Sequence, residues 1–276
     1  MISKNLFNLD KTKRNGNVRL RGIALPNEHG SWSILLEPLV GAGAVAFTPA
    51  TIWISMLFIG AFLMRQPLRI WLADRNAGRD LPQTWAARKY TLVYSAIFAA
   101  GLVGTIAIVP AANFLPLAIA APLCIVQIYY DMRHKSRSLI PELTGAVALS
   151  SSAALISLAG GWTMPAAASL WAIFILRLIP SVLYIRNRLR LEKGKSWSAV
   201  VPIVGHLIAL LAVAVLAFVG FSPIMPVVMF GILLGRAAFG LSPYRKKRKA
   251  MQIGIFEVIF GTLTVLSVIV GYRLHM

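Results

Sequence analysis

The 276-residue sequence contains little charge, few acidic residues and one cysteine. Only 13% of its residues are charged, whereas soluble globular domains contain about 25%. This deficit argues against a soluble enzyme. The single cysteine, Cys124, excludes an internal disulfide framework and a CxxC metal site. The four histidines are far apart in the sequence, which excludes an HExxH-type zinc motif.

The chain is instead rich in apolar and basic residues. Hydrophobic residues make up 58% of it, and 28 Lys and Arg against 9 Asp and Glu give a net charge of +19. Such a charge is typical of proteins that bind nucleic acid or an anionic membrane surface, and the apolar majority favours the membrane. We interpret the basic run 244–249 as a topology determinant that contacts lipid headgroups, so no nucleic-acid partner is expected.

Hydrophobic segments of spanning length recur along the whole chain. A transmembrane helix needs about 20 mainly apolar residues. The pattern predicts an all-α, polytopic integral membrane bundle of about nine transmembrane helices. The expected spans are 31–48, 50–72, 91–109, 113–130, 139–159, 166–187, 198–219, 222–241 and 251–272. Residues 1–29 are expected to be a basic cytoplasmic segment without a cleaved signal peptide, and 30–276 a single transmembrane domain.

The basic residues predict the orientation of this bundle. All Lys and Arg residues except Arg273 lie in the N-terminal segment or near the connections that follow the second, fourth, sixth and eighth spans. In a chain that crosses the membrane nine times, these segments lie on the same side, and the positive-inside rule makes that side cytoplasmic. We therefore expect a bacterial cytoplasmic (inner) membrane protein with its N-terminus inside and its C-terminus outside.

Several ionisable residues fall within the expected spans. Burying such groups in a membrane is costly, so they usually face protein or a water-filled cavity. The residues are Glu37, Arg65, Arg69, Glu142, Arg177, His206, Arg236 and Glu257. Nearly all belong to the cytoplasmic half, which predicts a polar, net cationic cavity open to that side. As alternatives, the three glutamates form structural ion pairs with the arginines, and Arg236 extends to the membrane interface.

Two of these residues have a functional and a structural interpretation. Arg177 lies near the middle of its span, one turn before Pro180, and is either a substrate-binding residue or a structural one. His206 lies about two turns into the seventh span. It either accepts a proton during catalysis or forms a hydrogen bond between helices.

The segment 65–80 is the first of two polar connections that we expect beside the cavity. Arg65 and Arg69 are spaced i and i+4, which places them on one helix face. We expect both to bind substrate.

The same segment carries the candidate metal ligands. Asp74 and Asp80 either hold Mg²⁺, a hard ion that prefers oxygen ligands and shares them with phosphate, or form ion pairs with Arg75 and Arg79. Asn76 lies between the two acids and is a candidate substrate ligand.

The second polar connection is 184–192. Arg186 and Arg190 are again spaced i and i+4, and Tyr184 precedes them. The planar guanidinium of an arginine can donate two parallel hydrogen bonds to a phosphate, so Arg186 and Arg190 are candidate substrate-binding residues. Tyr184 is a third candidate. The alternative is a helix end that lies in the membrane interface.

A third polar cluster precedes the first span. Pro26 and Gly30 interrupt the chain there, and Ser31 can cap the helix. A simple cap requires neither the carboxylate of Glu28 nor the imidazole of His29. Both are therefore candidate catalytic residues.

Three of these segments resemble a bacterial membrane protein family. They are Pro-Asn-Glu-His-Gly-Ser-Trp at 26–32, Pro-Glu-Leu-x-Gly at 141–145 and Tyr-x-Arg-x-Arg-x-Arg at 184–190. They look like the YwiC-like family, and the resemblance covers most of the chain. It implies a multi-pass membrane protein and does not imply a particular reaction.

The expected architecture also resembles the UbiA superfamily of membrane prenyltransferases. That resemblance implies nine helices around a central cavity, and acidic motifs after helices 2 and 6 that hold Mg²⁺ and diphosphate. The first motif corresponds here to Asp74, Asn76 and Asp80, whereas Arg186 and Arg190 replace the acids of the second.

These observations favour an enzyme of the prenyltransferase type that acts on a diphosphate-bearing or other anionic lipid. In this hypothesis the arginines neutralise the leaving group, Asp74 and Asp80 hold Mg²⁺, and Glu28, His29 or His206 removes a proton from the acceptor. The partner would be an anionic or isoprenoid lipid. The alternatives are a non-catalytic membrane protein that binds an anionic lipid or a protein partner, and an anion transporter.

Overall fold

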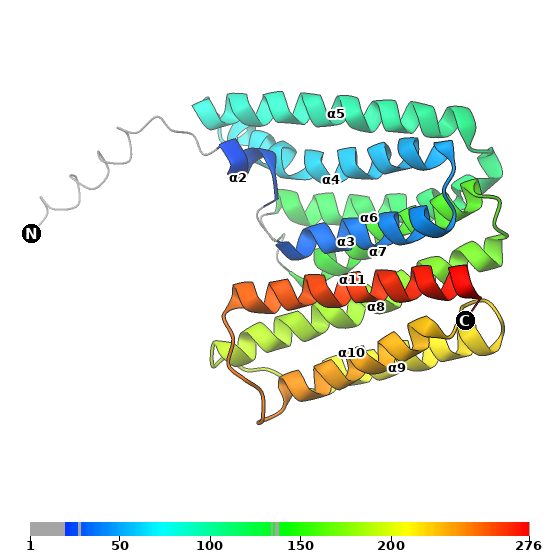
Figure 1. Cartoon of the computed structure of the whole chain (residues 1–276). Helices are drawn as coiled ribbons and strands as arrows, with labels where there is room; N and C mark the ends of the chain where they lie inside the picture. Colours follow the sequence, from blue (N-terminus) through cyan, green and yellow to red (C-terminus); the bar gives the residue numbers. More distant parts are fainter. Residues whose placement is uncertain (1–19, 27–28, 134, 136–137, 276) are drawn as a thin grey trace, which may run out of the picture.

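The computed structural model describes residues 20–26, 29–133, 135 and 138–275, and these residues contain helices and no strands. Nine of the helices are 17 to 29 residues long and run side by side as one bundle (Figure 1). They are α3 (His29–Val45), α4 (Pro49–Asn76), α5 (Pro82–Ile108), α6 (Leu115–Met132), α7 (Leu139–Ala159), α8 (Met164–Glu192), α9 (Val200–Phe218), α10 (Met225–Leu241) and α11 (Ala250–Leu274). A short helix, α2 (Leu20–Ala24), precedes them, and a 3-10 turn, η1 (Ala111–Phe114), precedes α6.

Each expected hydrophobic span overlaps one of these helices, and the all-α membrane fold class is confirmed. Seven helices of the described chain are long and apolar enough to cross a membrane: α4, α5, α6 with the turn before it, α7, α8, α9 and α11. The count of nine spans is not confirmed, because α3 and α10 are shorter. At 1.5 Å per residue, their 17 residues extend about 26 Å, less than the hydrocarbon core of about 30 Å.

Helices α4 and α8 extend further than the sequence pattern predicted. The two expected polar connections are largely helical, since α4 ends only at Asn76 and α8 only at Glu192. Gly78 and Gly194 follow these ends, and both have a φ of 63°. This left-handed conformation is the one that glycine supplies most readily at a helix end. The arginines of both segments are therefore held on rigid helices and not on loops.

Helix α7 lies at the centre of the bundle, where it packs against α3, α4, α6 and α8. Its buried face is built from small residues, including Ser150, Ser151, Ser152 and Ala153. Each of these serines donates a hydrogen bond to a carbonyl of its own helix. Small residues allow neighbouring helices to approach closely, which is the usual basis of packing in membranes.

The bundle has two distinct edges around this centre. Helix α5 packs on α4 at one edge, and α9 and α10 pack together at the other (Figure 1). Large apolar side chains on the outer faces remain exposed, such as Val103, Ile125 and Ile208. This belt is suited to contact with lipid chains.

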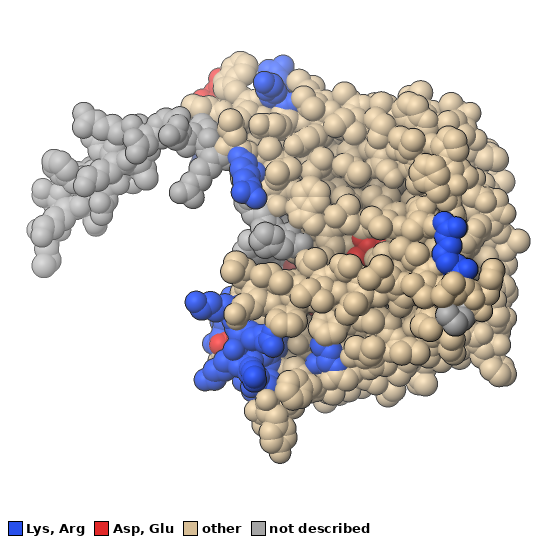
Figure 2. Space-filling model, viewed as in Figure 1, with Lys and Arg blue, Asp and Glu red and all other residues tan. Residues whose placement is uncertain are grey.

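One end of the bundle carries most of the basic residues, and we call it the basic end. The connections that follow α4, α6, α8 and α10 lie there, together with the start of α3 (Figure 1). Figure 2 shows Lys and Arg gathered at this end. Arg273 belongs to the opposite end, where it donates a hydrogen bond to the carbonyl of Ala44. The expected grouping of basic residues is therefore present among the described residues.

Candidate functional site

A cavity of about 620 Å³ lies in the bundle, between α3, α4, α6, α7, α8 and α11. Its mouth is at the basic end, because residues near the ends of α4 and α8 and near the starts of α7 and α11 line it, among them Arg69, Glu142 and Arg186. Its floor is deeper, at Glu37, Arg177 and Glu257. The volume is in the range of about 300–1,000 Å³ that is typical of small-molecule sites.

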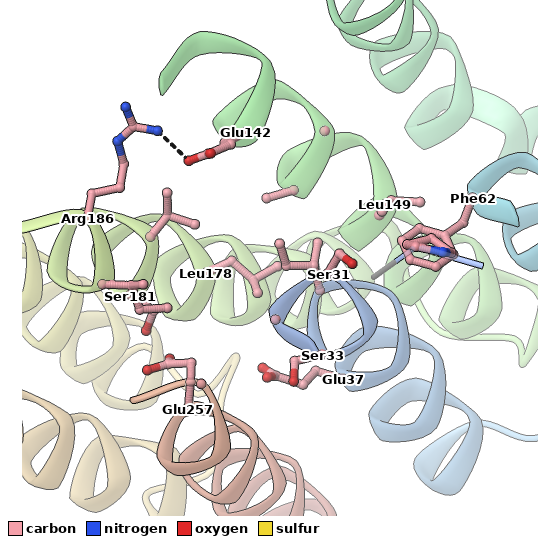
Figure 3. A pocket seen from close by; sticks show the side chains of 18 of the residues that line it. Ser31, Ser33, Glu37, Phe62, Glu142, Leu149, Leu178, Ser181, Arg186 and Glu257 are labelled. Atoms are coloured by element: carbon pink, nitrogen blue, oxygen red, sulfur yellow. Dashed lines mark hydrogen bonds and ion pairs between the residues drawn. The ribbon is translucent and has the colours of Figure 1, made fainter. Parts of the chain in front are cut away.

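The wall between mouth and floor is mainly apolar. On α8, Leu178, Val182 and Ile185 face the cavity at helical spacing. Phe62 and Leu149 line it from α4 and α7 (Figure 3). The cavity is therefore amphipathic, with charged groups at both ends and apolar side chains between them.

Arg177 organises the floor of the cavity. Its side chain is 1% exposed. Nη1 donates to Glu257 Oε1 at 2.8 Å and to the hydroxyl of Ser181, and Nη2 donates to Glu37 Oε1 at 3.4 Å. The arginine that the sequence placed deep in the membrane is thus held by carboxylates from α3 and α11. This is the arrangement expected of a buried charge.

Arg236 completes this buried charge network from α10. Its Nη1 donates to Glu257 Oε2 at 2.5 Å, and the guanidinium lies 4.4 Å from the centre of the Tyr184 ring. The interpretation that Arg236 extends to the membrane interface is wrong, because its side chain is only 9% exposed. The two arginines balance the charges of Glu37 and Glu257.

The mouth of the cavity contains partly exposed ion pairs. Arg186 Nη1 donates to Glu142 Oε2 at 2.7 Å, and these side chains are 32% and 34% exposed (Figure 3). Arg65 forms a two-bond fork with Asp131, at 2.6 and 2.9 Å. Arg69 Nη2 donates to Gln66 Oε1 at 3.0 Å. The mouth therefore offers guanidinium groups that remain accessible from the solvent side.

The structure brings four of the predicted substrate-binding residues to one cavity: Arg65, Arg69, Arg177 and Arg186. Arg190 is not among the lining residues. It is exposed and lines a smaller groove beside the mouth, between α8 and the start of α9. The two arginines nevertheless share a face as expected, because Arg186 lines this groove too, and only Arg186 of the two also lines the cavity.

Tyr184 does not line the cavity, contrary to the sequence prediction. It is two residues before Arg186, and two residues rotate a helix by about 200°. Tyr184 therefore faces α10, where the chain has Gly240 in place of a larger residue; an added Cβ there would lie 2.2 Å from the Tyr184 hydroxyl. Arg188 is one turn further on the same face and donates to the carbonyl of Gly240.

His206 also lies outside the cavity, so its assignment as a proton acceptor for a bound substrate is not supported. The ring is buried on α9. Its Nδ1 lies 2.8 Å from the carbonyl oxygen of Pro202, and its Nε2 lies 3.4 Å from Arg236 Nη2. These contacts match the structural alternative, a histidine that links two helices.

The predicted magnesium ligands are separated from the cavity as well. Asp74 is buried and accepts hydrogen bonds from Thr84 at 2.7 Å and from Gln83 at 3.2 Å, which fastens the end of α4 to the start of α5. Asp80 and Asn76 are exposed. The described residues contain no group of three or more His, Cys, Asp or Glu that could hold a metal. This donor set does not fit a Mg²⁺ site in the cavity.

The remaining catalytic candidates precede or begin α3. Glu28 lies outside the described residues, and the side chain of His29 is likewise not described. Their neighbours Pro26, Gly30 and Ser31 line the mouth. The proposed catalytic role of Glu28 and His29 stays a prediction.

Sequence reasoning missed Asp131 and Gln127. Both are on α6, and Asp131 is buried at the end of that helix. Gln127 lines the cavity and packs against Gly145 of α7, where an added Cβ would lie 2.1 Å from its amide nitrogen. Asp131 had one available signal. It is one of only 9 acidic residues in a chain with 28 basic ones, so charge alone favours its pairing with an arginine.

The sequence model of the YwiC-like protein family matches residues 25–157, slightly less than half of the chain. The match includes α3 to α7 apart from the last residues of α7, and therefore four of the six helices that line the cavity. No curated protein and no solved structure matches the chain. The resemblance to the YwiC-like family is thus confirmed, whereas the UbiA-like topology is not.

Proposed function

From the match to the YwiC-like family model over residues 25–157 and the helices long enough to span a membrane, we propose that this protein binds an amphipathic lipid with an anionic headgroup in the cavity at the basic end. One observation carries the proposal. Arg65 and Arg69 from α4, and Arg177 and Arg186 from α8, line a single cavity. An isoprenoid diphosphate is the ligand class that fits these features best.

The charges at the mouth support an anionic headgroup. Arg65 uses Nε and Nη2 in its fork with Asp131, and its side chain is 37% exposed. A guanidinium has five N–H donors, so the Nη1 group of Arg65 can donate to a further oxygen. Among the residues that the structure describes, the charged lining side chains are four arginines and three glutamates, Glu37, Glu142 and Glu257. The cavity itself therefore has a slight excess of positive charge.

The apolar wall supports a hydrocarbon tail. Leu149, Leu178 and Val182 lie deeper than the mouth, and burial of apolar chain against them is favourable by about 0.8 kcal/mol per CH₂ group. We further propose that the basic end faces the cytoplasm of a bacterial cell, in the inner membrane, according to the positive-inside rule. A ligand would then reach the cavity with its headgroup on the cytoplasmic side.

Prenyl transfer is the catalytic form of this proposal. Ionisation of an allylic diphosphate breaks the carbon–oxygen bond and leaves its electron pair on the diphosphate, which fixed cations stabilise. Arg65, Arg69 and Arg186 would supply these cations. A non-catalytic lipid-binding protein would use the same cavity and residues. Appearance of a prenylated acceptor together with free diphosphate distinguishes the enzyme from the binding protein.

The test compares two arginines on α8. Binding of farnesyl diphosphate to the full chain in detergent is measured for wild type, Arg186→Ala and Arg190→Ala. Loss of a charge-assisted contact should weaken binding about tenfold or more in Arg186→Ala. Arg190→Ala removes the same charge four residues away, outside the cavity, and should bind like wild type. Equal weakening in both variants, or no binding by wild type, would reject the proposal.

A further inference from the structure

We propose that the floor of the cavity is a second subsite, in which Glu37 accepts a hydrogen bond from a neutral donor group, such as an alcohol hydroxyl, at the far end of the bound ligand. This inference rests on the proposed function and narrows its ligand. The molecule would carry an anionic headgroup at the mouth and a hydroxyl or equivalent donor about one ligand length away. Nothing in the family resemblance assigns this subsite.

The observation that carries the inference is an unpaired oxygen. Glu37 is 5% exposed and lines the cavity. Its Oε1 accepts from Arg177, whereas its Oε2 has no hydrogen-bond partner among the described residues. A buried charged acceptor that is left unsatisfied is more destabilising than a neutral one. A ligand donor at Oε2 would remove this cost.

Helix α11 leaves room for the carboxylate of Glu37. Gly261 of α11 faces Glu37, and an added Cβ at that position would lie 2.0 Å from Glu37 Oε1. A larger residue would displace the carboxylate from the floor. Ser33 is one turn before Glu37 on α3 and lines the cavity too (Figure 3). The polar strip of α3 thus continues from the floor towards the mouth.

The charge of the network selects a neutral donor. Glu37 and Glu257 are balanced by Arg177 and Arg236, all of which are at least nine-tenths buried. A ligand ammonium would add an unbalanced positive charge to this buried group, which is costly in a membrane interior. A hydroxyl satisfies Oε2 and leaves the network neutral.

The depth of the cavity sets the length of the ligand. Arg186 at the mouth and Arg177 at the floor are nine residues apart on α8, which corresponds to about 14 Å along the helix axis. A chain of about ten carbon atoms, with bonds of about 1.5 Å, has a comparable length. The apolar side chains Leu178, Val182 and Ile185 lie along this path.

The experiment uses two matched probes, decyl phosphate and ω-hydroxydecyl phosphate, with the full chain in detergent. The hydroxylated probe should bind wild type at least about tenfold more tightly, because its hydroxyl makes a hydrogen bond to a charged acceptor. Non-specific partitioning into the micelle has the opposite preference, since the hydroxyl makes the probe less apolar. The two probes are compared on the wild-type protein, so this result does not depend on whether a variant folds.

Two variants of Glu37 test whether this residue causes the preference for the hydroxylated probe. Glu37→Leu should reverse it in favour of decyl phosphate, whereas Glu37→Gln keeps a carbonyl acceptor and should reduce it without reversing it. Equal binding of both probes to wild type would overturn the floor subsite and leave the headgroup site intact. An undiminished preference in Glu37→Leu would overturn it as well. Failure of both probes to bind would overturn the floor subsite, and the farnesyl diphosphate measurement decides the proposed function separately.

Discussion

Replacement of Arg177 by methionine tests the buried charge network most severely. Arg177 is hydrogen-bonded to carboxylates of both α3 and α11, through Glu37 and Glu257. Methionine fills much of the volume of the arginine stem without its charge. The variant would leave two buried carboxylates with Arg236 as the remaining guanidinium of the network. The floor would then carry a net negative charge in the membrane interior.

The structure sets the size of the expected effect. Removal of one member of a buried ion pair costs about 3–5 kcal/mol, because the partner charge is left uncompensated. Arg177 is 1% exposed, so solvent does not screen the loss. Arg186, which is 32% exposed in its pair with Glu142, is the matched control on the same helix. Its replacement by alanine should cost about 1 kcal/mol or less.

The assay is reversible unfolding of the purified chain in mixed micelles with increasing sodium dodecyl sulfate, followed by circular dichroism. The double variant Arg177→Met/Glu37→Gln restores neutrality to the network. It should therefore be more stable than the single Arg177→Met variant, with a coupling of about 0.5–3 kcal/mol between the sites. If Arg177→Met lowers the unfolding free energy no more than Arg186→Ala does, the network does not hold the bundle together.

Three further predictions follow from individual contacts. Gly261→Ala should destabilise the chain by about 1–3 kcal/mol, because the added methyl group clashes with Glu37. Gly254→Ala on the same helix should be neutral or stabilising in thermal denaturation, because an added Cβ there has open space. Arg186→Lys should weaken binding of farnesyl diphosphate more than a chelator of divalent metals does, because an ammonium cannot form the two parallel hydrogen bonds of a guanidinium. Isothermal titration at fixed ionic strength measures both effects, and a larger effect of the chelator would favour metal-dependent binding. A reporter fused after Lys249 should be active in the cytoplasm and one fused to the C-terminus should be active outside, and activity on the same side would contradict nine spans.

The positions of the helices could be predicted from sequence because they depend on local signals. Apolar runs and their Pro- or Gly-containing turns locate the apolar part of every long helix. The errors are at polar helix ends, where hydropathy falls but the helix continues: α4 and α8 extend almost to Gly78 and Gly194, and α5 begins at Pro82, nine residues before the expected span. Hydropathy indicates where a membrane ends and does not indicate where a helix ends.

The faces of the helices were only partly predictable. Periodicity correctly placed Arg65 and Arg69 on one side of α4. It could not decide which face of α8 meets the cavity, because Tyr184 and Arg186 point in nearly opposite directions and both are polar. The packing of α8 between α7 on one side and α9 and α10 on the other decides this. That arrangement is a long-range property and is not encoded in the spacing alone.

The partners of the arginines were the least predictable feature. The sequence suggested that glutamates pair with arginines, and Glu37, Glu142 and Glu257 do so. Asp131 pairs with Arg65 across 66 positions of the sequence, and no local pattern indicates that contact. Asp74 instead accepts from Thr84 at the start of the next helix. Carboxylates of the same local appearance thus have different structural roles, according to the helices that surround them.

Photocrosslinking of a bound ligand tests the central claim, that an anionic lipid occupies the cavity, most directly. A farnesyl diphosphate analogue with a photoreactive group in its tail is irradiated with the full chain, and labelled peptides are identified by mass spectrometry. The cavity predicts labels on α8 and α7, near Leu178 and Leu149, that excess farnesyl diphosphate suppresses. Labels confined to the exposed outer faces of α5 and α9, near Val103 and Ile208, and unaffected by competitor would contradict it.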